Sequence, residues 1–313
     1  MGMFCSTIIP TVGRDTLGRA VNSVLSQSFA EDDFEVIVVN DSGKPLPWQD
    51  WQSSNRVRVI HTNCRERSVA RNTGAAIARG EYLHFLDDDD WLLPGAFYHF
   101  WELTHKRNAA IYYGGYRFVD SMGNTREDCY PDEDGNCLIR FMSGEWQPLQ
   151  ASLFDARIFH SLGGFAPLHV LRGGDEDVDL TRRISLQYDI AGVKEILATI
   201  RIGREESTTN YSNLTEQSRQ SRELILNMPG AFSRLCASAR EREIAPSYWH
   251  GRLIWIYLSS VVLNFQQGKF FTAFSRLMYA AGSLIKSYKF WLSSKFWRGA
   301  TRPHLANGWL RKS

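Results

Sequence analysis

The sequence has few cysteines, and none of them are paired by spacing. The five are odd in number and form no CxxC motif: Cys5, Cys64, Cys129, Cys137 and Cys236. This usage argues against a disulfide framework and against a zinc knuckle, and it favours a reducing compartment.

A long hydrophobic run and a signal peptide are also missing. The longest uncharged run, residues 253–268, has 16 residues and includes Asn264, Gln266 and Gln267. It is too short and too polar for a membrane span. Residues 1–10 read directly as a strand instead of a signal peptide. We therefore expect a soluble cytoplasmic body.

The net charge is small but unevenly distributed. A formal charge of +2 gives no reason to expect a nucleic-acid binder. From Arg240 onward there are 12 Lys and Arg residues and only two acids, Glu241 and Glu243, whereas the preceding chain has 24 basic and 32 acidic residues. An acidic body with a basic tail predicts a different partner for each part.

The pattern of the first half predicts an α/β fold. Apolar runs typical of buried strands alternate with helical periodicity, at residues 5–9, 34–39, 57–60 and 82–86. This alternation predicts a doubly wound, mostly parallel sheet that binds ligands beyond the carboxyl ends of its strands. We expect this domain over residues 1–210 and an α-helical appendage over residues 211–313.

Local signals predict several boundaries. Pro10 is expected to end the first strand. Ser68 is expected to cap a helix that runs through residues 70–78. Residues 111–119 and 193–202 are expected to be strands, and residues 128–136 a polar loop.

Four consecutive aspartates, Asp87 to Asp90, directly follow the run at 82–86. Two carboxylates ~4 Å apart repel by about 4 kcal/mol at an effective dielectric near 20. A buried strand end therefore tolerates the cluster when a positive group compensates it, and Mg²⁺ or Mn²⁺ with substrate phosphates fits this need. A solvated acidic loop is the alternative.

Other polar residues follow the predicted strands or lie near them. Asp41 follows the second strand, where it either accepts a hydrogen bond from a nucleobase N–H or forms a simple turn. Arg71 and Asn72 lie early in the helix before the aspartates and either contact a nucleotide or lie on the helix surface.

A second acidic cluster, residues 175–179, surrounds a predicted helix start near Asp175. Acids in a first turn are favoured by capping and by the helix dipole, which accounts for one or two of the four. A carboxylate over a sugar acceptor could act as a general base.

Six short motifs occur in an order and spacing that resemble the family 2 glycosyltransferases with the GT-A fold. They cover roughly residues 4–205 and are found at residues 8–14, 39–42, 70–74, 85–90, 162–165 and 176–177. The resemblance implies transfer of a sugar from a nucleotide-sugar with inversion at the anomeric carbon.

The resemblance also implies roles for individual residues. Asp177 would be the catalytic base, and Asp87 and Asp89 would be metal ligands. The donor would contact Pro10, Thr11, Arg14, Asp41, Arg71, Asn72, Asp87 and Asp88. The acceptor side would include Trp146, Gly163, Gly164 and Glu176.

One feature departs from the family pattern. A histidine often follows the last strand as a further metal ligand, but residues 200–207 contain none. Glu205 or Glu206 could replace it as ligands, or Arg201 and Arg204 could contact the diphosphate.

The C-terminal region is basic and aromatic. Residues 270–285 keep one apolar helical face, which favours a helical hairpin over residues 249–285, packed on the catalytic domain or on a second copy in a homodimer. Residues 286–313 interleave Lys and Arg with Trp, Tyr and Phe, as suits the inner face of a membrane bearing a lipid-linked acceptor.

Two other functions fit the sequence less well. One is a nucleotidyltransferase, for which residues 11–14 form a poor phosphate loop, and the other is a non-catalytic membrane-surface scaffold.

Overall fold

The computed structural model of the chain describes residues 2–30, 33–131, 134–167, 176–202, 211–241 and 246–301, the side chains of residues 211–218 excepted. The chain divides into two units. The first comprises residues 1–135, 147–180 and 189–209, and the second comprises residues 136–146, 181–188 and 210–313. The helical unit thus includes two short segments before residue 210. The predicted division of the chain at that residue remains a prediction.

Strands and helices alternate along the first unit. Its elements are β1 (Cys5–Thr11), α1 (Leu17–Leu25), β2 (Phe34–Asn40), η2 (Asp50–Ser53), β3 (Val57–His61), α2 (Arg67–Ala76), β4 (Tyr82–Phe85), β5 (Trp91–Leu92), α3 (Ala96–Lys106), β6 (Ile111–Val119), β7 (Thr125–Cys129), η3 (Leu149–Ala151), β8 (Ser152–Asp155), α5 (Ala156–Ser161), the start of α6 (Glu176–Ser185), and β9 (Ile190–Arg201).

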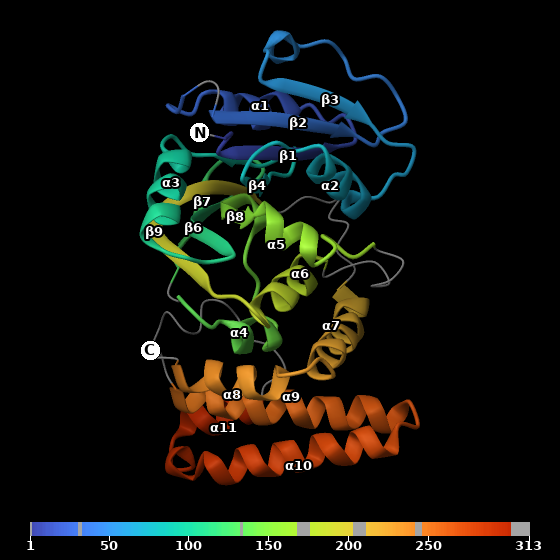
Figure 1. Cartoon of the computed structure of the whole chain (residues 1–313), viewed down its shortest axis with the longest axis vertical. Helices are drawn as coiled ribbons and strands as arrows, with labels where there is room; N and C mark the ends of the chain where they lie inside the picture. The colour runs from blue at the N-terminus through green and yellow to red at the C-terminus, as the bar shows by residue number, and fades with distance from the viewer. Residues whose placement is uncertain are drawn as a thin grey trace. The chain divides into compact units, whose positions relative to one another are not determined.

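The strands form one mixed sheet in the order β3-β2-β1-β4-β8-β6-β9-β5, with β7 paired to β6 (Figure 1). From β3 to β4 the neighbours are parallel, whereas β8, β5 and β7 run antiparallel to the strands beside them. All seven residues of β1 and of β2 are buried, as expected for strands covered on both faces. The predicted α/β class is confirmed.

β1 continues past the proline predicted to end it. Pro10 and Thr11 pair with Val39 and Asn40 of β2. On the other side of β1, pairing with β4 ends at Ile8. Backbone groups alternate between the two neighbours, and the missing N–H of Pro10 falls on the β4 side, beyond the end of that strand. The proline therefore costs the sheet no hydrogen bond.

Two other local predictions were wrong. The cap of α2 is Glu66, whose carboxylate accepts from the Ser68 N–H, and Ser68 itself lies buried inside the helix. Asp128 belongs to β7 instead of a loop, because residues 125–129 pair with β6 in the sheet, with Asp128 opposite Arg117. The two side chains also form an ion pair at 2.7 Å.

Glu35, the second residue of β2, is buried and accepts hydrogen bonds from several donors. Its carboxylate accepts from the Ser6 hydroxyl (2.7 Å), the Arg79 N–H (2.8 Å) and Arg58 Nε (3.0 Å). Burial opposes ionisation, but these donors and the arginine charges outweigh it and hold the pKa below its ordinary value of 4.5.

Glu35→Gln is expected to lower the free energy of unfolding by roughly 1.5–3 kcal/mol at neutral pH, because hydrogen bonds to a charged group are lost. The folded-state pKa is depressed, so the wild-type advantage is complete above pH 4.5 and is lost as the pH falls through the folded value. Urea denaturation of both proteins at several pH values measures this. A deficit that stays constant down to pH 2 would contradict the account.

The second unit consists of helices. They are α4 (Leu138–Met142), the end of α6, α7 (Tyr211–Leu226), α8 (Ala231–Glu241), α9 (Pro246–Gln266), α10 (Phe270–Lys286), η4 (Tyr288–Phe290) and α11 (Ser294–Thr301). Their shared core includes Leu138, Leu235, Trp249 and Leu253. α9 and α11 approach closely: a Cβ on Gly299 would lie 2.2 Å from the Tyr248 carbonyl oxygen. In the described part of the chain, no helix combines the length and hydropathy needed to cross a membrane.

Candidate active site

Three parallel strands end side by side and bring distant residues together. The Asp41 N–H, just after β2, donates to the Thr11 carbonyl at the end of β1 (2.9 Å). The Leu86 N–H, just after β4, donates to the Ile8 carbonyl (3.1 Å). Asp41 and the aspartates that begin at Asp87 therefore leave the same edge of the sheet on either side of β1, where ligands of such sheets bind.

Asp88 ties the loop after β4 to the loop after β1. Its carboxylate is buried and accepts from the Thr11 hydroxyl (2.6 Å) and from Arg14 Nη1 (2.5 Å). The Thr11 hydroxyl in turn accepts from the Gly13 N–H (2.9 Å). Three residues predicted to bind the donor, Thr11, Arg14 and Asp88, thus hold one another in place, while Pro10 is buried in β1.

Arg71 of α2 lies between two carboxylates. Its Nη2 donates to Asp87 (2.7 Å) and its Nη1 to Glu176 at the start of α6 (3.0 Å). Glu176 also accepts from Arg67 Nη2 (2.8 Å). Burial opposes ionisation of both acids, but the arginines outweigh it and hold the pKa of Asp87 and that of Glu176 below their ordinary values.

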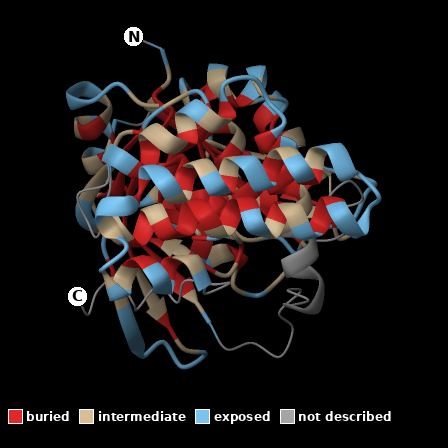
Figure 2. Cartoon of the chain, turned by 90° about the horizontal axis from the view of Figure 1, so that it is seen from below, coloured by how far each residue is buried: buried red, intermediate tan, exposed pale blue. Residues whose placement is uncertain are grey.

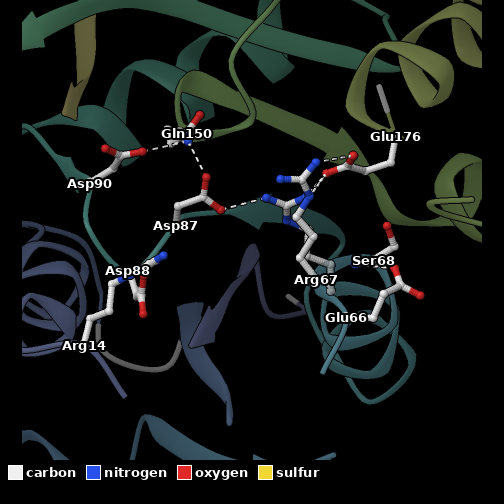
Figure 3. A network of polar contacts seen from close by, with 10 residues as sticks. Arg14, Glu66, Arg67, Ser68, Asp87, Asp88, Asp90, Gln150 and Glu176 are labelled. Carbon is white, nitrogen blue, oxygen red and sulfur yellow. Dashed lines mark hydrogen bonds and ion pairs between the residues drawn. The ribbon is translucent and has the colours of Figure 1, made fainter. Parts of the chain in front are cut away.

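Gln150 of η3 bridges two of the four aspartates (Figure 3). Its Nε2 donates to Asp87 (2.9 Å) and to Asp90 (2.7 Å), and Asp90 also accepts from the Arg201 N–H (2.8 Å). Burial, together with the charges of Asp87 and Asp89, nevertheless raises the pKa of Asp90 well above its ordinary value.

His84 of β4 forms a hydrogen bond with the backbone of Gln150. Burial lowers its pKa to about 4, so the ring is neutral. The Gln150 carbonyl can only accept, so the ring nitrogen Nε2, 2.9 Å away, carries the proton, and Nδ1 accepts from the Thr7 hydroxyl (3.2 Å). A chain of contacts from β1 to Asp87 thus fixes one carboxylate at the edge of the sheet.

The protein itself supplies much of the positive charge that the aspartate cluster needs. Arg14 meets Asp88 and Arg71 meets Asp87, while burial raises the pKa of Asp90. Asp87 and Asp89 both remain partly exposed. Among the described residues no group of three or more His, Cys, Asp or Glu side chains could hold a metal alone. The donor set still fits a hard cation that keeps places for phosphate oxygens.

Asp41 is buried and incompletely satisfied. Its Oδ1 has no hydrogen-bond partner among the described residues. Burial raises its pKa, although the charge of Arg65 acts in the opposite direction. A buried acceptor without a partner costs free energy, so this oxygen is suited to a ligand N–H.

Asn72 fastens the glycine loop to α2. Its Nδ2 donates to the Phe165 carbonyl (2.8 Å) and its Oδ1 accepts from the Phe165 N–H (2.9 Å). Gly164 has φ +65°, and a Cβ there would lie 2.5 Å from Asn72 Oδ1. Gly163 is exposed at φ +79°. Asn72 is a predicted donor contact, but both its amide nitrogen and its amide oxygen form hydrogen bonds with the loop predicted to face the acceptor.

The remaining predicted residues are dispersed. Asp177 is half-buried in the first turn of α6, where it accepts from the Val178 N–H (2.8 Å). Trp146 is half-buried and belongs to the helical unit. The stretch proposed to replace the missing histidine, residues 203–206, lies outside the described residues, as does Asp175.

Gln150, Arg67 and His84 had no signal in the sequence, because each acts through a partner at least 60 residues away.

Gln150→Leu is expected to lower the free energy of unfolding by about 1–3 kcal/mol, since it removes one hydrogen bond to the buried Asp90 carboxylate and one to the partly exposed Asp87 carboxylate. Gln147→Leu, which removes one bond to the Ser152 hydroxyl, serves as the matched control with a smaller loss in urea denaturation. Equal losses in both variants would show that the bridge contributes nothing beyond an ordinary buried amide.

The family model Glycosyl transferase family 2 matches residues 6–167, more than half of the chain. The chain therefore belongs to this family. It is 32% identical over 117 residues to the poly(ribitol-phosphate) beta-N-acetylglucosaminyltransferase TarP of Staphylococcus aureus (strain N315), covering 36% of each protein. An uncharacterized glycosyltransferase of Rickettsia conorii is 27% identical over 225 residues, which are 68% of this chain and 36% of that protein. The chain thus spans little more than a third of the length of these relatives.

Solved structures share the fold. The S. aureus TarS fragment 1–349 in complex with UDP-GlcNAc superposes with a TM-score of 0.62 at 15% identity, over 92% of this chain and 90% of the fragment. The mannosyltransferase PcManGT of Pyrobaculum calidifontis, in complex with GDP-Man and Mn²⁺, gives 0.50 at 14% identity, over 96% of this chain and 83% of that chain. The predicted GT-A fold with added C-terminal helices is confirmed.

Proposed function

We propose that this glycosyltransferase moves a sugar from a nucleotide-sugar, with UDP as the preferred carrier, to a hydroxyl of a glycan or lipid-linked acceptor with inversion. The observation that carries the proposal is the placement of buried Asp41 and partly exposed Asp87 at strand ends on either side of β1. One suits a nucleobase and the other the diphosphate end of the same ligand. The complex of TarS with UDP-GlcNAc supports this choice of donor class.

On the donor side, Asp41 Oδ1 would accept from a base N–H, for which it has no competing partner among the described residues. Pro10, Thr11, Arg14 and Asp88 would form the wall of the nucleoside pocket, with Arg14 and Thr11 fixing the Asp88 carboxylate. Arg71 and Asn72 would hold α2 and the glycine loop in position beside the donor.

Asp87 and Asp89 would hold Mg²⁺ or Mn²⁺ together with donor phosphate oxygens. When bound, the cation would stabilise the negative charge on the departing nucleoside diphosphate. Gln150 and Arg71 keep the Asp87 carboxylate oriented without using up its lone pairs, since a carboxylate offers about four acceptor positions.

Asp177 would act as the general base on the acceptor. It would take the hydroxyl proton while the acceptor oxygen bonds to the anomeric carbon and the bond from that carbon to the diphosphate oxygen breaks. Its neighbour Glu176 is clamped by Arg67 and Arg71, which anchors the start of α6 to α2 and limits the movement of the base. Gly163, Gly164 and Glu176 would border the acceptor, and the acceptor contact predicted for Trp146, which belongs to the second unit, remains a prediction.

The test is turnover of a panel of UDP-, GDP-, CDP- and dTDP-sugars with Mn²⁺ or EDTA. We expect metal-dependent release of one nucleoside diphosphate and its loss in Asp89→Ala, with Asp50→Ala as a matched exposed control. If no donor is bound or turned over with metal, the non-catalytic scaffold replaces this proposal. Release of pyrophosphate from nucleoside triphosphates would favour the nucleotidyltransferase.

A further inference from the structure

The outward side of α10 is apolar and exposed to solvent. The side chains on this surface, the α10 face, are Phe270, Phe271, Phe274, Leu277, Met278 and Ile285. They recur at helical spacing, and Phe271 is 94% exposed. Along the long helices, exposed turns alternate with buried ones in the burial view (Figure 2). Contiguous apolar patches of this kind mark interaction surfaces in soluble proteins.

The packing of the opposite side fixes which face points outward. Ala273, Arg276 and Ala280 of α10 are buried. Arg276 pairs with Glu223 of α7 at 2.9 Å, and Tyr279 stacks on Phe232 of α8 with ring centroids 4.6 Å apart. A rotation of α10 that hid its phenylalanines would break this buried ion pair, so the exposure of the α10 face is built into the unit.

The charges around this face have one sign. From residue 244 to the end the sequence contains no Asp or Glu. The arginines that point inward, Arg252 and Arg276, are buried, whereas Lys269, Lys286 and Lys289 are exposed at the ends of α10. Exposed aromatic and aliphatic side chains continue beyond Lys286 at Tyr288, Trp291 and Leu292.

We propose that the α10 face docks on an anionic lipid surface, with α10 lying in the plane of the interface and the lysines among the headgroups. An amphipathic helix with large apolar side chains and flanking lysines suits this position. A second copy is the competing occupant, but it would bring two cationic rims together, with no acid on these helices to pair with them. Headgroup phosphates supply the missing negative charge. The inference rests on the proposed function only in that docking would bring the enzyme to a lipid-linked acceptor.

This inference extends the contact predicted for residues 286–313 to α10. α11 is part of the helical core, because Phe296 is fully buried and a Cβ on Gly251 would lie 2.0 Å from the Phe296 carbonyl oxygen. Deleting the tail would therefore disturb folding, and point substitutions on the α10 face give the cleaner test.

The experiment is flotation of the full chain with vesicles of phosphatidylcholine containing 30% phosphatidylglycerol, in low salt and without donor or acceptor. The parent is expected to float with the vesicles, and the triple variant Phe271→Ser, Phe274→Ser, Met278→Ser to lose at least about 10-fold in partitioning. Lys286→Glu with Lys289→Glu is expected to lose about five-fold for each charge removed. The matched control changes exposed apolar residues elsewhere, Trp48→Ser, Trp101→Ser and Met122→Ser, and is expected to float like the parent.

Thermal melting verifies that each variant is folded, and light scattering gives the oligomeric state. Equal flotation of the parent and the α10 triple variant, or no flotation of the parent, overturns the proposal. A parent dimer that the α10 substitutions convert to a monomer assigns the face to a second copy and also overturns it. Because no sugar transfer is measured, these outcomes are independent of the proposed reaction.

Discussion

Asp177→Asn is expected to lower kcat by roughly 10²–10⁴-fold while the affinity for the nucleotide-sugar donor stays within about two-fold. The amide keeps the size of the carboxylate and its contact with the Val178 N–H, but it cannot take a proton from the acceptor hydroxyl. Steady-state turnover with a saturating acceptor measures the loss, and donor titration measures the affinity.

Two controls separate a base from a positioning residue. Asp128→Asn, in an exposed pair on β7, is expected to leave kcat unchanged. Glu176→Gln weakens the clamp by Arg67 and Arg71 and is expected to lower kcat less, while the pH dependence of kcat keeps its shape. If Asp177→Asn retains kcat within ten-fold of the parent, the base is another residue.

Arg71→Met is expected to have the largest effect on stability, a loss of roughly 3–5 kcal/mol in the free energy of unfolding. The substitution keeps a similar volume but leaves Glu176, which is 3% exposed, with Arg67 as its remaining cation among the contacts described above, and it removes the cation beside Asp87. Urea denaturation at neutral pH measures the loss. Lys106→Met, which breaks an exposed pair with Glu102, is expected to change stability by less than about 0.5 kcal/mol.

The same variant has a defined pH dependence. Arg71 helps to hold the pKa of Glu176 below its ordinary value of 4.5, so its contribution is complete above that pH. It is lost as the pH falls through the depressed folded pKa, and the deficit of Arg71→Met should shrink there. A deficit below about 1 kcal/mol at neutral pH would show that the attraction in these ion pairs only offsets the free-energy cost of desolvating their charges.

The arrangement explains how four consecutive aspartates can follow a buried strand. Asp88 and Asp90 are buried against structural partners, whereas Asp87 and Asp89 stay partly exposed at the edge of the sheet. The acidic run thus contains two buried and two partly exposed carboxylates. A divalent cation would therefore add to a charge balance that Arg14 and Arg71 already begin.

The sequence by itself determined the class of fold and the edge of the sheet at which the polar residues gather. Apolar runs such as residues 34–39 can only be satisfied by burial on both faces, and polar residues directly after them, such as Asp41 and Asp87, must then leave the same edge of a parallel sheet. The strand predicted at residues 111–119 coincides with β6 for the same reason. Motif order added the family, which the match to residues 6–167 confirms.

Only the tertiary structure decided which polar side chain meets which. Gln150 lies 63 residues from Asp87, and Arg71 lies 105 residues from Glu176, so no local pattern could pair them. Tertiary structure also decided that α10 presents its phenylalanines outward, because the sequence gives the apolar face of a helix but not the side on which neighbours cover it. Periodicity is a property of a segment, whereas hydrogen bonds, ion pairs and exposure depend on the elements packed against it.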